Sequence, residues 1–167
     1  THLGWLEGQK TVRLYADCAA AIADEAPVST MIVLAVKPQM MDDAIAGLGV
    51  MKHVDCAYLS IAAGISTGWL KQRLGDDAIV IRAMPNTPAA IGKGITALYA
   101  NAPNQARDLA SQLMAAVGRV VHVQDEALMD GVTALSGSGP AYVFLMVEAM
   151  TEAGIKAGLP DDLAAEL

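Results

Sequence analysis

Short apolar runs alternate with amphipathic stretches along the first three quarters of the chain. The run over residues 30–36, Thr-Met-Ile-Val-Leu-Ala-Val, is continuous and rich in β-branched residues, and Lys37-Pro38 ends it. Such a run is typical of a strand covered on both faces, as in a parallel sheet. Similar patterns predict further strands over residues 12–16, 56–61, 78–84, 94–100 and 119–123.

Helical periodicity fills the segments between these strands. The predicted helices cover residues 39–48, 67–74 and 103–117. Ser66 and Gly75 have the residue types of N-terminal and C-terminal caps for the second helix. Gly118 is expected to cap the third. Alternating strands and helices predict an α/β fold, with a doubly wound sheet over residues 1–124.

The pattern changes after the last predicted strand. Helices are expected over residues 126–135 and 140–157, with a break at residues 137–139, and Pro160 precedes a further helix. The helix over 140–157 is nearly all apolar, which suits a helix that packs against another subunit. Residues 125–167 are therefore predicted to begin an all-α oligomerisation domain.

Composition and charge narrow the classes of function. The 167 residues are 54% hydrophobic and 17% charged, with a net charge of −7 and no basic run, so a disordered chain and a nucleic-acid partner are disfavoured. No apolar stretch reaches the roughly 18–20 residues of a membrane span. Cys18 and Cys56 have no companions, which predicts buried free thiols and no metal site. The absence of a signal-peptide pattern favours a cytoplasmic location.

Three predicted strands end in segments that suit a flat, phosphate-bearing cofactor. Ligands of open α/β sheets bind beyond the carboxyl ends of the strands. Lys37 precedes a proline that keeps its backbone extended, so its carbonyl and side chain are placed to face a ribose or phosphate. Residues 62–64, Ala-Ala-Gly, have little side-chain bulk, and Asn86 can donate and accept hydrogen bonds. Each segment alone is also an ordinary turn, but three at one sheet edge favour a cofactor.

Two glycine patterns elsewhere carry less weight. Residues 92–97 match G-x-G-x-x-A but lead into a predicted strand, so no helix N-terminus would face a phosphate. Residues 136–140, Ser-Gly-Ser-Gly-Pro, precede a helix and could either cradle an anion or form a close-packed helix joint. A hydrolase elbow there would need a preceding strand and a later histidine, and the sequence offers neither.

Four of these segments together resemble the motifs of a known enzyme family. Residues 35–39 (AVKPQ), 60–66 (SIAAGIS), 84–88 (MPNTP) and 134–142 (ALSGSGPAY) resemble those of pyrroline-5-carboxylate reductase, in the same order and at similar spacing. The resemblance implies a Rossmann-type sheet followed by a helical dimerisation domain. It also implies NADPH- or NADH-dependent reduction of 1-pyrroline-5-carboxylate to L-proline, the last step of proline biosynthesis.

The resemblance further implies a site. Asn86 would lie near the nicotinamide, and Thr133 is the implied catalytic residue, close to the substrate nitrogen. The other implied cofactor contacts are Ala35, Val36, Lys37, Pro38, Ala62, Ala63 and Gly64. Hydride addition to an imine needs positioning and electrostatics from the protein but no nucleophile. The implied assembly is a homodimer or a larger homo-oligomer formed through the C-terminal helices.

Two departures from the family pattern shape the remaining expectations. The chain is expected to lack the family's first strand, with its glycine-rich loop, and the C-terminal helices that hold the substrate carboxylate. The isolated 167 residues are therefore expected to be inactive. Two alternatives stay open: a related Rossmann dehydrogenase or imine reductase, or a non-catalytic scaffold module.

Overall fold

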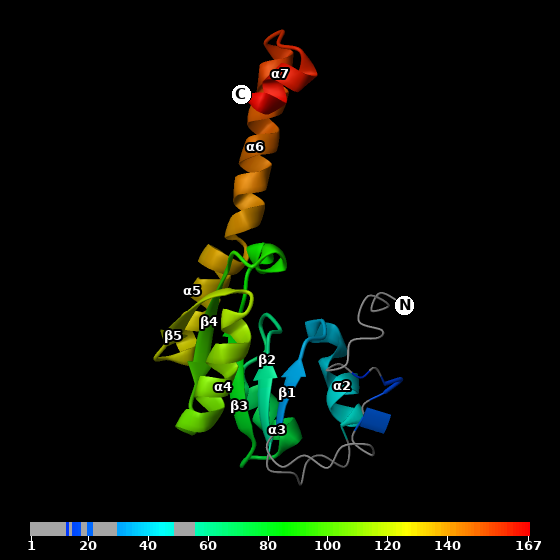
Figure 1. Cartoon of the computed structure of the whole chain (residues 1–167), viewed down its shortest axis with the longest axis vertical. Coiled ribbons are helices and arrows are strands. Elements are labelled where there is room, and N and C mark those ends of the chain that lie inside the picture. The colour runs from blue at the N-terminus through cyan, green and yellow to red at the C-terminus, as the bar shows by residue number, and fades with distance from the viewer. Residues whose placement is uncertain (1–12, 14, 18–19, 22–29, 49–55) are drawn as a thin grey trace. The chain divides into compact units, whose positions relative to one another are not determined.

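The computed structural model describes residues 13, 15–17, 20–21, 30–48 and 56–167 (Figure 1). The chain divides into two compact units. The first unit comprises Thr1–Ala83 with Ala100–Ala110, and the second comprises Met84–Tyr99 with Ser111–Leu167. The boundary at residues 124 and 125 stays a prediction.

The first unit is a parallel sheet with connecting helices. Its strands are β1 (Thr30–Leu34), β2 (Cys56–Ser60) and β3 (Ile79–Met84). The helical elements are η2 (Pro38–Met40), α2 (Met41–Gly47) and α3 (Thr67–Leu74). β2 pairs in parallel with both β1 and β3, and all five of its residues are buried. The continuous apolar run forms β1, as predicted, but Val33 is 45% exposed, so the prediction that both faces of this strand are covered is wrong.

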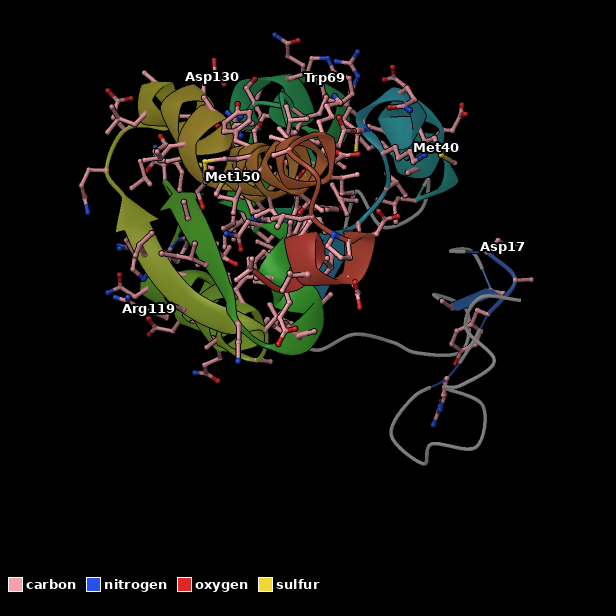
Figure 2. All side chains as sticks on the ribbon, turned by 90° about the horizontal axis from the view of Figure 1, so that it is seen from above. Asp17, Met40, Trp69, Arg119, Asp130 and Met150 are labelled. Carbon is pink, nitrogen blue, oxygen red and sulfur yellow. The ribbon has the colours of Figure 1, made fainter. Side chains whose placement is uncertain are left out.

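The core of the first unit joins the strands to α2 and α3. Met41, Leu59 and Leu70 are fully buried, and each such side chain contributes about 1.5–3 kcal/mol through the area it removes from water. On the surface, Arg73 forms a salt bridge with Asp42 of α2. Its guanidinium carbon Cζ lies 3.4 Å from the centroid of the Trp69 ring. Trp69 is labelled on α3 in Figure 2. This exposed contact ties α2 to α3.

The buried ring of Tyr58 predicts a loss of stability in alkali. Burial raises the pKa of Tyr58 above its ordinary value, and the Cys56 thiol adds to the rise. The unfolded chain therefore releases the phenol proton first, and unfolding becomes easier as the pH rises beyond about 10. At pH 11 this linkage costs about 1.4 kcal/mol, which Tyr58→Phe should abolish.

Urea unfolding at pH 8 and pH 11 measures this effect. The wild type should lose more stability between the two pH values than Tyr58→Phe. Tyr142→Phe removes an exposed tyrosine and is the matched control. Equal losses in the wild type and Tyr58→Phe would contradict the account.

The strand predicted at residues 12–16 is wrong where its residues are described. Arg13 and Tyr15 have no regular structure, and Ala16 lies in a bend. The carboxylate of Asp17 accepts a hydrogen bond from the Ala20 amide over 2.8 Å, so the backbone turns here instead of extending. Residues 12 and 14 of this prediction, and Cys18, lie outside the described residues. Cys56 is a buried free thiol, as expected.

The second unit contains a parallel strand pair and the C-terminal helices. The strands are β4 (Gly94–Ala100) and β5 (Gly118–Val123). The strand order is β1-β2-β3-β4-β5. Helix α4 (Asn104–Ala115) begins in the first unit and ends in the second. The other helical elements of the second unit are η4 (Thr87–Ile91), η5 (Glu126–Leu128), α5 (Met129–Val132), the π-helix η6 (Thr133–Gly137), α6 (Gly139–Lys156) and α7 (Asp161–Glu166).

Gly118 is a strand residue, and its prediction as a helix cap is wrong. It opens β5 opposite Gly94, with φ at +148°. A Cβ on Gly118 would lie 2.0 Å from the Gly94 carbonyl oxygen. Close approach of two backbones, together with a positive φ, therefore requires glycine here.

The predicted break at residues 137–139 falls at Ser138, which lies in a bend between two helical elements. Thr133–Gly137 form one π-helical turn, closed by the Ser138 amide, which donates to the Thr133 carbonyl over 2.8 Å. Ser138 keeps a right-handed helical backbone, and α6 begins at Gly139. The wider turn absorbs one extra residue, and the break is confined to the single residue Ser138.

The long helix α6 is exposed on all sides and packs against α7 (Figure 1). Its large apolar side chains Tyr142, Val143, Phe144, Leu145, Met146, Val147 and Met150 are each between 53% and 67% exposed. Six of these residues are consecutive, so they point in every direction around the helix. Met150 is labelled in Figure 2. No helix in the described part of the chain combines the length and the hydropathy that a membrane span needs.

Candidate functional site

The turns after β1 and β2 lie next to each other in the first unit. Leu34 pairs with Ser60, and the Ile61 amide donates to the Leu34 carbonyl over 3.3 Å. Residues 35–38 and 62–64 therefore leave the sheet side by side, at its carboxyl edge. This is the edge where open α/β sheets bind ligands.

The turn after β2 leaves open space above its backbone. Ala62 is buried, and its amide donates to the Ser60 hydroxyl oxygen over 3.3 Å. Ala63 and Gly64 are exposed. Gly64 has φ at +74°, and no atom lies within 4 Å of the place where its Cβ would be. A flat ring can approach this backbone without meeting a side chain, so the turn fits the predicted ligand.

The turn after β1 exposes Lys37, whose carbonyl also closes the turn. Lys37 has an extended backbone, with φ −63° and ψ 147°, and Pro38 follows as the first residue of η2. The Lys37 carbonyl accepts a hydrogen bond from the Met40 amide over 2.9 Å. One lone pair of this carbonyl is used by the turn, and the prediction that the carbonyl faces a ribose stays a prediction. The exposed ammonium group is the part that can meet a phosphate.

Asn86 holds the loop that follows β3 onto the start of β4. Its side-chain oxygen Oδ1 accepts a hydrogen bond from the Ile95 amide over 2.9 Å, and its main-chain carbonyl accepts from the Ala89 amide over 3.0 Å. The sequence predicts a side chain that both donates and accepts toward a ligand. The Ile95 contact leaves the Nδ2 donor as the part of the amide that suits this role.

This geometry separates two roles of Asn86 by substitution. Asn86→Asp keeps an acceptor for the Ile95 amide but removes the Nδ2 donor, whereas Asn86→Ala removes both. We expect Asn86→Ala to lower the free energy of unfolding by about 1–3 kcal/mol and Asn86→Asp to lower it by less. Both should weaken binding of NADPH or NADH to the intact protein. If Asn86→Asp bound the cofactor as tightly as the wild type does, Asn86 would have only its structural role.

Thr133 opens the π-helical turn, and its hydroxyl has a defined partner. The hydroxyl donates to the Met129 carbonyl over 2.8 Å, one helical turn earlier. Met129 is fully buried and anchors this part of the helix. Because the hydroxyl proton is used internally, the lone pairs of the Thr133 oxygen are what the residue can offer to a ligand.

A contact that the sequence did not predict links the loop after β3 to this turn. A Cβ on Gly137 would lie 2.3 Å from the terminal methyl carbon, Cε, of Met84 and 3.7 Å from the methyl carbon of Thr133. Because Gly137 has no side chain, it leaves room for the Met84 methyl. The Ser-Gly-Ser-Gly-Pro segment is open to two interpretations, an anion cradle or a close-packed helix joint. This packing supports the second.

The structure groups the predicted site residues by unit. The seven predicted site residues in the turns after β1 and β2 belong to the first unit, and Asn86 and Thr133 belong to the second. Among the described residues, no three His, Cys, Asp or Glu side chains gather in a group that could hold a metal ion. Small residues, one cation and two polar side chains suit positioning and hydride transfer rather than nucleophilic attack.

Comparison with known proteins gives a consistent result. Residues 126–167 match the family model for pyrroline-5-carboxylate reductase dimerisation. A pyrroline-5-carboxylate reductase of Pseudomonas aeruginosa is 42% identical over 164 residues, which are 97% of this chain and 59% of that protein. The solved reductase of Coxiella burnetii has a TM-score of 0.81 at 34% identity and covers 98% of this chain. The chain belongs to the pyrroline-5-carboxylate reductase family.

The family relationship extends over both compact units, but not over the whole length of the relatives. The chain covers 60% of the Coxiella burnetii reductase chain. It also resembles the Plasmodium falciparum reductase, which was solved with NADP bound, with a TM-score of 0.75 at 30% identity, over 81% of this chain and 52% of that one. The α/β sheet and the helices that follow it are thus those of the pyrroline-5-carboxylate reductase fold, as the sequence predicted.

Proposed function

We propose that the intact protein reduces 1-pyrroline-5-carboxylate to L-proline with NADPH or NADH. The observation that carries this proposal is 42% identity to a pyrroline-5-carboxylate reductase across nearly the whole chain. The paired turns at the carboxyl edge of β1 and β2 support it, because they are shaped for a flat cofactor. The NADP bound to the Plasmodium falciparum relative is of the same chemical class.

The residues of the first unit fit a nicotinamide dinucleotide. The open turn at residues 62–64 offers small side chains and accessible backbone, and the exposed Lys37 offers a positive charge for a phosphate. When bound, such a cofactor supplies a hydride. The contribution of these residues is to hold the cofactor at the sheet edge.

Thr133 positions the substrate nitrogen in this proposal. The imine is reduced in its protonated form: the hydride adds to the imine carbon, and the C=N electron pair becomes the lone pair of the amine nitrogen. The Thr133 hydroxyl already donates to the Met129 carbonyl. Its oxygen therefore accepts from the iminium N–H and holds the positive charge in place. Thr133 is in this way a positioning acceptor rather than the proton donor.

The apolar surface of α6 supports assembly with a second copy of the chain. The match of residues 126–167 to a dimerisation family agrees with this interpretation. Monomeric proteins rarely expose a contiguous apolar patch of this kind. We therefore propose that α6 forms the core of a homo-oligomer interface.

Charge placed on α6 should break this interface. Leu145→Glu puts a carboxylate among exposed apolar side chains, and burying it unpaired costs several kcal/mol. The variant should elute as a monomer in light scattering coupled to chromatography, at concentrations where the wild type is a dimer or larger. Glu148→Lys changes an exposed, already charged position on the same helix and should leave assembly intact. A monomeric wild type would contradict the proposal.

A direct spectrophotometric assay tests the proposed activity. With 1-pyrroline-5-carboxylate, the intact protein should oxidise NADPH or NADH, read as loss of absorbance at about 340 nm. With 3-hydroxy acids and the oxidised cofactor, it should give no gain of absorbance at this wavelength. Turnover of the hydroxy acids instead would favour a related dehydrogenase. A folded protein that turns over neither would favour a scaffold module and overturn the proposal.

A further inference from the structure

The terminal methyl of Met84 occupies the space that a side chain on residue 137 would fill. The 2.3 Å between Met84 Cε and the Cβ position of Gly137 is far below the separation of about 3.5–4.0 Å at which carbon atoms pack. The methyl carbon of Thr133 lies 3.7 Å from the same position. Met84, Gly137 and Thr133 therefore meet at one point of the second unit.

The loop that follows Met84 is closed by its own hydrogen bonds. Asn86, two residues later, is bound to the Ile95 amide through its side chain. The Lys93 amide donates to the Pro88 carbonyl over 3.0 Å, which closes the loop just before β4 begins. The loop that starts at Met84 is thus fixed to β4 at both of these points.

The π-helical turn, by contrast, has few contacts of its own on the outer side. Ala134 and Leu135 are exposed, Leu135 to 81%. A π-turn is a rare departure from the α-helix that occurs mostly as a single turn and often at functional sites. The Met84 methyl on Gly137 is a contact that can define it from the inner side.

We propose that Met84 is a positioning residue for Thr133. Its thioether side chain rests on Gly137 and fixes the π-helical turn, so that the Thr133 oxygen keeps its direction toward the substrate nitrogen. This inference rests on the proposed reduction of pyrroline-5-carboxylate. It adds a pair, Met84 and Gly137, that acts on the reaction without touching the substrate or the cofactor.

A double-mutant cycle in the intact protein tests the pair. Gly137→Ala places a Cβ where the Met84 methyl lies, so this flexible end of the side chain must move off the turn. The variant should lower kcat about threefold to tenfold while the KM for the cofactor stays within about twofold, because the lost contact lies on the Thr133 side of the site. Met84→Ala should lower kcat about threefold to tenfold. The double variant should be no worse than Gly137→Ala, because removing the thioether makes room for the new methyl.

A direct measurement of the contact accompanies the kinetics. With ¹³C-methyl methionine, the Met84 methyl should show a nuclear Overhauser effect to Gly137 Hα and to the Thr133 methyl, and Gly137→Ala should shift its resonance. Leu113→Ala, a truncation of a partly exposed side chain in α4, should leave kcat unchanged.

The outcomes separate the two proposals. An active wild type in which the effects of Met84→Ala and Gly137→Ala multiply, or in which Gly137→Ala keeps the wild-type kcat, overturns the positioning role alone. Loss of thermal stability without loss of kcat overturns it too, because a purely structural contact behaves that way. A folded wild type that does not reduce the imine overturns the proposed function, and the positioning role falls with it.

Discussion

Gly118→Ala is expected to lower the free energy of unfolding by about 2–5 kcal/mol. Its φ of +148° is unfavourable for any residue with a side chain. The new Cβ would lie 2.0 Å from the Gly94 carbonyl oxygen and 2.6 Å from the Gly94 nitrogen, so backbone atoms rather than a flexible side chain must move. Gly94 cannot retreat easily, because a Cβ there would itself be 2.8 Å from the Ala89 Cα.

Two other glycines separate the causes of this loss. Gly92 has φ at +69° but open space around it, so Gly92→Ala should show the cost of backbone strain alone, about 1 kcal/mol. Gly131 is exposed, helical and free of neighbours, and Gly131→Ala should be neutral or stabilising by up to about 1 kcal/mol. Urea unfolding of the three variants measures the order of their losses in the free energy of unfolding. A Gly118→Ala variant no less stable than Gly92→Ala would contradict the close contact between β4 and β5.

Thr133→Val is expected to lower kcat/KM for pyrroline-5-carboxylate by about 10- to 100-fold. Valine keeps the shape of threonine but loses the oxygen that accepts from the iminium N–H. A hydrogen bond to a charged group contributes about 1.5–3 kcal/mol, and 1.36 kcal/mol corresponds to a factor of ten in rate. The Met129 carbonyl also loses its partner, but this costs stability rather than turnover.

Thr133→Ser is the matched control for this substitution. Serine keeps the hydroxyl and should retain kcat/KM within a few fold. Steady-state kinetics of both variants, at a temperature well below their unfolding transitions, gives the comparison. Wild-type kcat/KM in Thr133→Val would remove Thr133 from the site.

The elements whose signals are local could be predicted from the sequence. The continuous apolar run gave β1, and α3 follows its predicted bounds because Ser66 caps it through the Trp69 amide and Gly75 ends it. The glycine pattern at residues 92–97 was correctly rejected, since Gly94 opens a strand. Such features depend on residues within a few positions of each other.

The features that the sequence did not predict depend on distant partners. The role of Gly118 comes from the backbone of Gly94, and the π-helical turn leaves no periodic signal because it inserts one residue into the helical segment that ends at Gly137. The bond from Asn86 to Ile95 and the contact of Met84 with Gly137 likewise join segments that only the fold brings together. For this reason the site residues could be named from motifs, while their partners and free hydrogen-bonding atoms could not.

Isotope transfer tests the central claim most directly. The intact protein would be incubated with 1-pyrroline-5-carboxylate and NADPH or NADH carrying deuterium at C4 of the nicotinamide, and the proline formed would be analysed by mass spectrometry and NMR. The account predicts L-proline with one deuterium at Cδ, the former imine carbon. No proline from the folded protein, or proline without deuterium at Cδ from both C4-deuterated epimers of the cofactor, would contradict it.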